Sequence, residues 1–128
     1  MNIIPKDKHD LESISSLDSI PNDELEPYLP ELLVWIQDMN WPVAGVISKR
    51  LSKSGREVVE PIKKVLKSDD AIWKYFVITG VVEHLSKDVR EELMDEIIRI
   101  VNNPSIAEAE EEVDLVARDI IVMCSHGI

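Results

Sequence analysis

The side chains best suited to catalysis or metal binding are few and scattered along the chain. The three histidines are His9, His84 and His126, and the single cysteine is Cys124. No two histidines lie four residues apart and no Cys-x-x-Cys pair is present, so the ligand spacing of a zinc site is missing. Cys124 and His126 are near neighbours, but neighbours in sequence rarely align as nucleophile and base. We therefore expect no enzyme, no metal and no cofactor.

The acidic run from Glu108 to Asp114 is the densest cluster of possible cation ligands. It lacks the Asx-Gly loop of an EF-hand, and its acids fall where a helix begins. Acids in a first helical turn are favoured by the helix dipole, so we interpret the run as the start of a helix rather than as a cation site. The chain also lacks a glycine-rich phosphate loop and a Gly-x-Ser-x-Gly elbow.

Charge is the most uneven property of the sequence. The net charge is −11, yet residues 49–67 carry seven basic side chains against Glu57 and Glu60. An acidic chain repels nucleic acid as a whole, which argues against a general DNA or RNA binder. A protein or peptide partner fits better, and the candidate contacts in a groove are Lys49, Arg50 and Lys53, joined by Lys74. The alternative is a solvated surface of salt bridges.

Two tryptophans occupy similar contexts. Asp38-x-x-Trp41 lies 32 residues before Asp70-x-x-Trp73, and each motif follows a Leu/Val-rich helical stretch. In one interpretation each indole fills the corner between paired helices, with its N–H bonded to Asp38 or to a backbone carbonyl. In the other, Trp41 and Trp73 form a ridge that binds a partner, because tryptophan is enriched at binding hot spots.

The elements that must position these residues are helices. Apolar residues recur at helical spacing nearly throughout, and no segment keeps a strand pattern. Pro42 suits a first helical turn with Asn40 as its cap, and the Ser68–Asp70 cluster suits another start. The predicted helices cover residues 8–19, about 27–36, 42–51, 56–67, 70–85, 86–101 and about 106–121.

The Asp-x-x-Trp spacing also indicates a repeat. A period in the thirties made of two helices per unit is typical of an α-solenoid of the HEAT or armadillo kind. We therefore predict an all-α, HEAT-like superhelix of six to seven helices that forms a single domain over residues 1–128.

Location is predicted from what the sequence lacks. It has no run of about 18 apolar residues and no long apolar stretch near its start, and its one cysteine has no partner within the chain. These features favour a cytoplasmic protein that does not enter a membrane.

Four segments resemble a known family. They are PKDKHD, LPELLVWIQDMNWPVA, VVEPIKKVLKSDDAIWKY and NNPSIAEAEEEVDLVARDII, and together they extend over nearly the whole chain. They look like an uncharacterised bacterial family known only as a domain of unknown function with a HEAT-like helical fold. The resemblance implies a helical-repeat architecture and implies no activity.

We predict a non-catalytic protein–protein interaction module that is a monomer or a weak homodimer. One alternative is an immunity protein that neutralises a basic toxin by charge complementarity. Another is a nucleic-acid-binding or repair enzyme on a HEAT-like scaffold, which would need a continuous basic groove.

Overall fold

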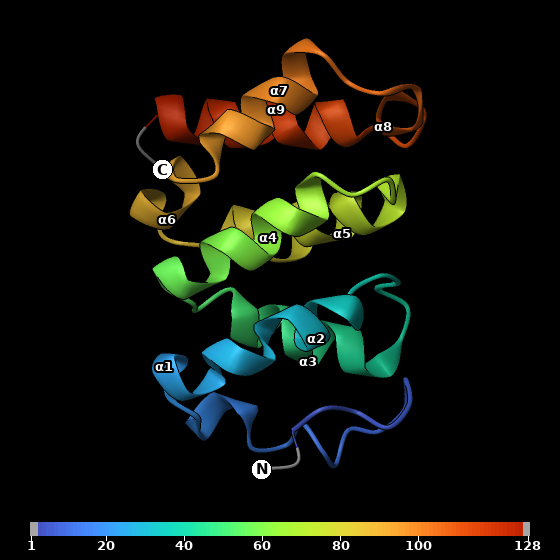
Figure 1. The fold of residues 1–128 in the computed structure, drawn as a ribbon, viewed down its shortest axis with the longest axis vertical. Coiled ribbons are helices and arrows are strands. Elements are labelled where there is room, and N and C mark those ends of the chain that lie inside the picture. The colour runs from blue at the N-terminus through green and yellow to red at the C-terminus, as the bar shows by residue number, and fades with distance from the viewer. Residues whose placement is uncertain (1–2, 127–128) are drawn as a thin grey trace.

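The computed structural model describes residues 3–126, and within them the chain forms helices, turns and loops without a strand. Helices stack in three layers along the long axis (Figure 1). The first layer holds α1 (Asn22–Leu25), α2 (Leu29–Val34) and α3 (Pro42–Leu51), and the second holds α4 (Val59–Leu66) and α5 (Ala71–Gly80). The short α6 (Lys87–Glu91) leads to a third layer of α7 (Met94–Asn102), α8 (Ile106–Glu110) and α9 (Val113–Ser125).

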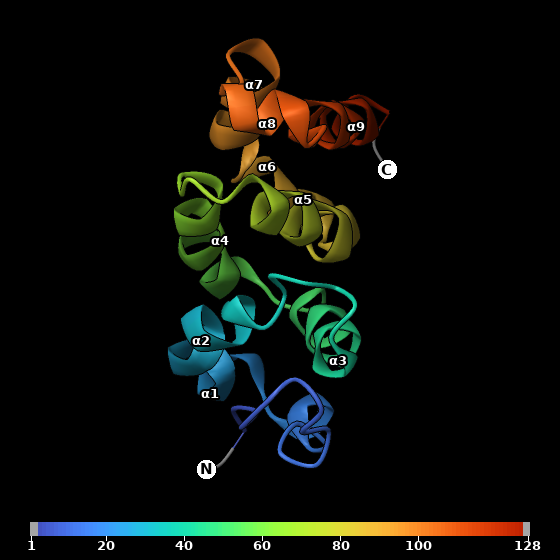
Figure 2. The same cartoon turned by 90° about the vertical axis from the view of Figure 1, so that its right-hand side faces the viewer.

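The layers align into two columns. Figure 2 shows α2, α4 and α7 on one side and α3, α5 and α9 on the other. Contacts run within layers, as between α2 and α3, α4 and α5, and α7 and α9. They also run between layers, from α2 to α4, from α3 to α5 and from α5 to α9. An all-α fold is therefore confirmed.

Several helix starts follow from local chemistry. Pro42 opens α3, where its missing N–H costs no helical hydrogen bond. Asp70 caps α5, since its carboxylate accepts a 3.0 Å hydrogen bond from the backbone N–H of Trp73. The expected cap at Asn40 is wrong, because Trp41 is the N-cap of α3 and no side chain caps it.

The predicted first helix over residues 8–19 is also wrong. The segment forms turns followed by a 3-10 helix, η1 (Leu17–Ser19), and its backbone N–H groups reach carbonyls two or three residues back. Ser15 and Ser19 donate their hydroxyl protons to the carbonyls of Glu12 and Ser16. Serine and aspartate compete with helical bonding in this way, and the segment is rich in both.

The long helices of the C-terminal half are shorter than predicted. α5 ends at Gly80, and the 3-10 helix η4 (Val82–His84) follows it. Residues 86–101 divide into α6 and α7. Residues 106–121 divide between α8 and α9, because the chain turns at Glu112, whose φ of 61° lies in the left-handed region.

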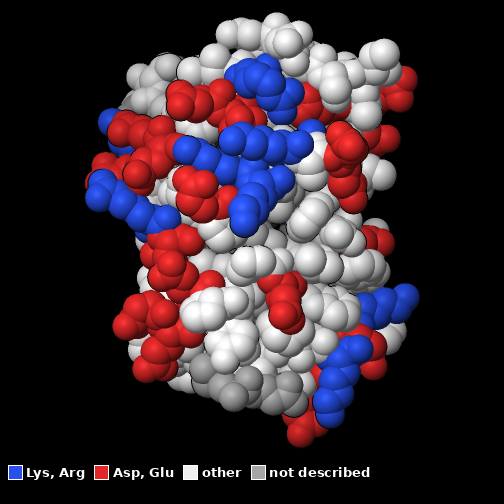
Figure 3. Space-filling model, in the orientation of Figure 1, with Lys and Arg blue, Asp and Glu red and all other residues white. Residues whose placement is uncertain are grey.

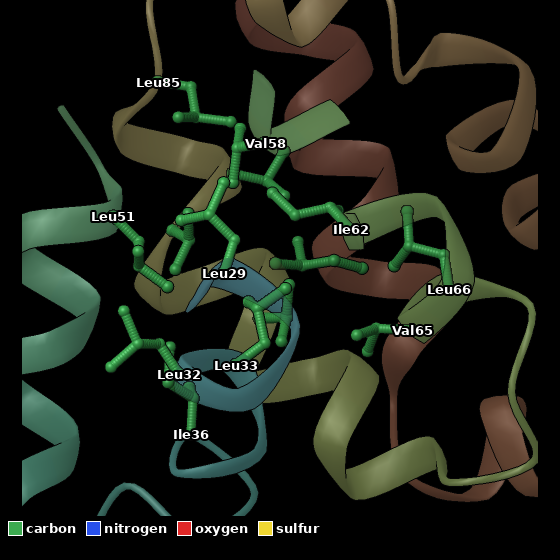
Figure 4. Close-up of a cluster of buried hydrophobic side chains, with 14 of the residues drawn as sticks. Leu29, Leu32, Leu33, Ile36, Leu51, Val58, Ile62, Val65, Leu66 and Leu85 are labelled. Atoms are coloured by element: carbon green, nitrogen blue, oxygen red, sulfur yellow. The ribbon is translucent and has the colours of Figure 1, made fainter. Parts of the chain in front are cut away.

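One core runs through all three layers. Its buried apolar side chains extend from Ile3 to Ile120 as a single cluster. Between the first two layers, side chains of α2 face those of α4 (Figure 4). They include Leu29, Leu32, Leu33, Ile62, Val65 and Leu66, and Ile36 joins them from the turn after α2. Each fully buried Leu or Ile contributes about 1.5–3 kcal/mol, so this seam holds the layers together. No helix within residues 3–126 has the length and apolar character needed to cross a membrane.

Candidate functional site

Trp41 and Trp73 occupy different structural positions despite their matching motifs. Trp41 immediately precedes α3, whereas Trp73 is the third residue of α5. Asp70 caps its helix through the N–H of Trp73, but the carboxylate of Asp38 accepts from the N–H of Asn40 instead. The two motifs are therefore not equivalent copies.

Both indoles are half-buried and pack against the core. The Trp73 indole N–H donates a 2.9 Å hydrogen bond to the carbonyl of Leu33, which joins α5 to α2 across two layers. Trp41 packs edge-on against Trp35, with ring centroids 5.9 Å apart. This geometry favours a structural role for both, and the backbone-carbonyl partner expected for an indole N–H is found at Trp73.

Arg50 was expected at the groove, and this prediction is wrong. Its side chain points into the fold and is only 4% exposed. The guanidinium donates to the carbonyls of Leu17 (3.0 Å) and Ile20 (2.8 Å) and to the side-chain oxygen of Asn22 (2.8 Å). Arg50 therefore fixes the irregular N-terminal segment against α3 and is not available to a partner.

Lys74 is likewise not a surface contact, being only 5% exposed. Its ammonium group donates a 2.9 Å hydrogen bond to Glu108. Glu108 lies in the first turn of α8, as the sequence predicts for this acidic run, and it is fully buried there. Its carboxylate also accepts two hydrogen bonds from Arg99, at 2.8 and 2.9 Å, and one of 2.8 Å from the N–H of Ser105.

The cluster of Lys74, Arg99 and Glu108 joins the second layer to the third. Burial alone would raise the pKa of Glu108, but hydrogen bonds from Arg99, the Ser105 N–H and Lys74 lower it to about 2. Arg99 also donates a 3.2 Å hydrogen bond to the carbonyl of Leu66 at the end of α4. These contacts indicate a structural role for the cluster. It contains a single carboxylate held by two cations, which is not a pair of carboxylates arranged for acid–base chemistry.

The other basic side chains of residues 49–67 are dispersed. Lys63 and Lys67 lie on the α4 side of the molecule, within 4.0 Å of Glu60 and 3.9 Å of Glu96. Arg56 pairs with Glu92 at 2.9 Å. In Figure 3, which views the side of α2, α4 and α7, several basic side chains gather in one patch with acidic side chains around it. The sequence cluster is nevertheless divided, because Arg50 is buried and Lys49 and Lys53 line a pocket at the ends of α3 and α5.

Lys49 and Lys53 do line a hollow. A pocket of about 640 Å³ lies where the end of α3 meets the end of α5, and we call it the α3/α5 groove. Its polar lining consists of Ser48, Lys49, Ser52, Lys53, Thr79 and His84. Met39 and Gly80 complete the wall, and a Cβ placed on Gly80 would lie 3.5 Å from the Cβ of Ser48. Gly80 thus marks the close approach of the two helices.

The groove is positively charged and its cations are largely uncommitted. Lys53 lies 3.6 Å from Asp18, but both side chains are well exposed, so that pair is weak. Within residues 3–126, neither Lys49 nor His84 forms a salt bridge. Sequence reasoning missed His84, because it seemed part of a helix end; only the termination of α5 at Gly80 brings it to the groove.

No group of three or more His, Cys, Asp or Glu side chains could hold a metal ion in the described part of the chain. Cys124 is half-buried, and its sulfur lies 3.9 Å from the sulfur of Met94. His126 is exposed at the end of α9. The neighbouring Cys and His thus lie in different surroundings.

Comparison with known proteins places the chain by family. No curated protein matches it. A family model described as "Domain of unknown function (DUF5071)" matches residues 3–121, which is most of the chain and includes all four segments noted in the sequence. The chain therefore belongs to the DUF5071 family.

Proposed function

We propose that this protein is a non-catalytic, HEAT-like module of the cytoplasm that binds an acidic segment of a partner protein in the α3/α5 groove. The main observation in support is that Lys49, Lys53 and His84 line this one groove together. Arg50 and Lys74, in contrast, use their charge inside the fold.

The layered architecture supports the comparison with helical repeats. Helix pairs stack so that α3, α5 and α9 form one column (Figure 2). In solenoid proteins such a column of equivalent helices presents an extended surface to partners. The α3/α5 groove lies on this column, where two successive layers meet.

The composition of the groove supports an acidic peptide as occupant. The ammonium groups of Lys49 and Lys53 and the imidazole of His84 can donate hydrogen bonds to carboxylates, whereas the hydroxyls of the groove already donate to backbone carbonyls. Nucleic acid is a poorer fit, since Lys49 lies on α3 and Lys53 in the turn after it, whereas Lys63 and Lys64 lie on α4 in the opposite column. A duplex or single strand needs a continuous basic track.

A basic partner is the second candidate, as for an immunity protein that neutralises a basic toxin. It has one specific observation in its favour. A pocket of about 430 Å³ beside α4 is lined by Asp23, Glu26, Glu57 and Glu60, with Arg56 as its basic residue. Such a surface would attract cations, in contrast to the α3/α5 groove.

Affinity capture from a lysate of the source organism tests the proposal. The baits are the wild type, Lys49→Glu/Lys53→Glu, and the control Lys64→Glu/Lys87→Glu, which makes the same charge change at exposed sites outside the groove. We expect an acidic protein to be captured by the wild type and the control and lost from the groove variant. Circular dichroism checks that all baits are folded.

Equal capture by the wild type and the groove variant would contradict the proposal. A captured protein that is basic, and that is lost instead with Glu57→Lys/Glu60→Lys, would favour the second candidate. Light scattering of the baits distinguishes a monomer or weak homodimer from a larger assembly.

A further inference from the structure

The exposed face of α5 is unusually apolar for a helix at a protein surface. Ile72, Tyr75, Phe76 and Thr79 follow the i, i+3, i+4, i+7 spacing of one helical face, and all are exposed or half-buried. The most exposed of the four is Ile72, which is 48% exposed. We call these four residues the α5 track. A surface helix normally presents charged residues outward, as α4 does with Glu60 and Lys64.

One end of the α5 track opens into an acidic pocket. A hollow of about 310 Å³ is lined by Ile72, Tyr75 and Phe76 and by the three acids from Glu110 to Glu112. The Tyr75 and Phe76 rings pack edge to face, with centroids 5.8 Å apart. The three carboxylates are exposed, and none takes part in a salt bridge within residues 3–126.

The other end of the track enters the basic α3/α5 groove, which Thr79 and Gly80 line. The helical rise from Ile72 to Thr79 is about 10 Å. An extended peptide covers that distance in about three residues. The track thus joins two hollows of opposite charge across an apolar strip.

We propose that the α5 track binds a short segment of a partner protein that carries acidic residues at one end, about three apolar residues in the middle and basic residues at the other end. The acidic end lies in the α3/α5 groove and the basic end at Glu110–Glu112. This inference rests on the proposed function, because it names the sequence class of the segment that the groove receives.

Charge complementarity excludes the other common occupants. An anionic membrane or a nucleic acid would meet the three carboxylates at the acidic end, where it would be repelled. A wholly acidic peptide would be repelled there too. A segment with both charges satisfies each end, and the two ends together fix its direction along α5.

Fluorescence polarisation with labelled synthetic peptides tests the inference. The mixed probe is Asp-Glu-Leu-Val-Leu-Lys-Lys, made also in reverse order to sample both directions. The acidic probe replaces both lysines by glutamate. We expect one direction of the mixed probe to bind the wild type about 10-fold more tightly than the acidic probe does. Raising the salt concentration should weaken this preference.

Two variants sharpen the test. In Glu110→Lys/Glu111→Lys the preference should invert, so that the acidic probe binds more tightly than the mixed probe. The control Glu24→Lys/Glu31→Lys changes the same charge at exposed sites on α1 and α2 and should keep the wild-type preference. Ile72→Ser should weaken both probes about threefold, because it removes an exposed apolar contact without opening the core.

The outcomes separate the two proposals. If both probes bind equally and Lys49→Glu/Lys53→Glu abolishes both, the groove is a binding site but the α5 track is not. If Glu110→Lys/Glu111→Lys leaves the preference unchanged, the acidic end has no role and the inference is wrong. If neither probe binds the wild type in either direction, both proposals fail.

Discussion

Cationic side chains fasten the two ends of the helical stack; Lys74 and Arg50 are buried and Arg99 is half-buried, and their partners differ. At the C-terminal end, Lys74 and Arg99 meet the carboxylate of Glu108. At the N-terminal end, the acceptors that Arg50 meets within residues 3–126 are all neutral: two backbone carbonyls and the side chain of Asn22. One nitrogen of Arg50, Nη1, is buried and has no hydrogen-bond partner in the described part of the chain.

The difference reflects what each cation holds. Glu108 also completes a capping box with Ser105, so the ion pairs fix a short helix as well as the contact between layers. Arg50 instead donates to two backbone carbonyls of the irregular segment before α1, and that of Leu17 also accepts from the N–H of Ile20. A charged pair suits two well-formed layers, and a guanidinium with several donors suits a segment that offers several neutral oxygen acceptors.

The largest expected effect comes from removing the negative charge at the C-terminal end. Glu108→Gln leaves the buried ammonium of Lys74 without a counter-charge, and we expect a loss of about 3–5 kcal/mol in the free energy of unfolding. Urea denaturation measures it. Glu111→Gln, on an exposed acid three residues along, should stay within about 0.5 kcal/mol of the wild type. A loss below about 1 kcal/mol for Glu108→Gln would show that the ion pairs contribute little to the free energy of unfolding.

The next effect is a pH dependence confined to the same end. The pKa of Glu108 lies at about 2 in the fold against an ordinary 4.5, so its contribution is complete above about pH 5 and falls as the pH drops toward 2. This shift corresponds to about 3 kcal/mol. Urea denaturation at pH 7, 5, 4 and 3 should show a steeper decline for the wild type than for Glu108→Gln. Parallel declines would contradict the assignment, and Arg50→Met should keep the wild-type slope.

The smallest effect is expected at the N-terminal end. Arg50→Met removes the hydrogen bonds to Leu17, Ile20 and Asn22 but leaves no charge unpaired, so we expect a loss of about 2 kcal/mol in the free energy of unfolding. Hydrogen exchange should accelerate mainly in residues 13–25, because Arg50 holds that segment. Arg56→Met is the matched control; its exposed pair with Glu92 is worth less than about 1 kcal/mol. Uniform acceleration across all three layers would mean that Arg50 supports the whole fold.

Much of the fold could be predicted from local sequence. The apolar spacing within α4, Pro42 at the start of α3 and Asp70 before α5 all identify helices correctly. The segment over residues 8–19 could not be predicted from periodicity, since hydrogen bonds of serine side chains override the apolar pattern. The division at Glu112 was hidden as well, because a glutamate in the left-handed region has no sequence signal.

The candidate site was predicted only in part. Lys49 and Lys53 do line a groove, but His84 and the apolar face of α5 join it through the meeting of two layers. Arg50 and Lys74 were expected beside them and instead lie inside the fold. On a helical wheel these cations cannot be told from exposed ones, because lysine and arginine stems also cover apolar surface.

The sequence by itself determined that the chain is helical and acidic and where several of its helices begin, since capping, proline geometry and apolar periodicity act within a few residues. The tertiary structure alone decided which charges are buried. Lys74 and Glu108 are 34 residues apart, and a carboxylate leaves water only when cations come within hydrogen-bond reach. That condition depends on how the second layer meets the third, which no local pattern in the sequence encodes.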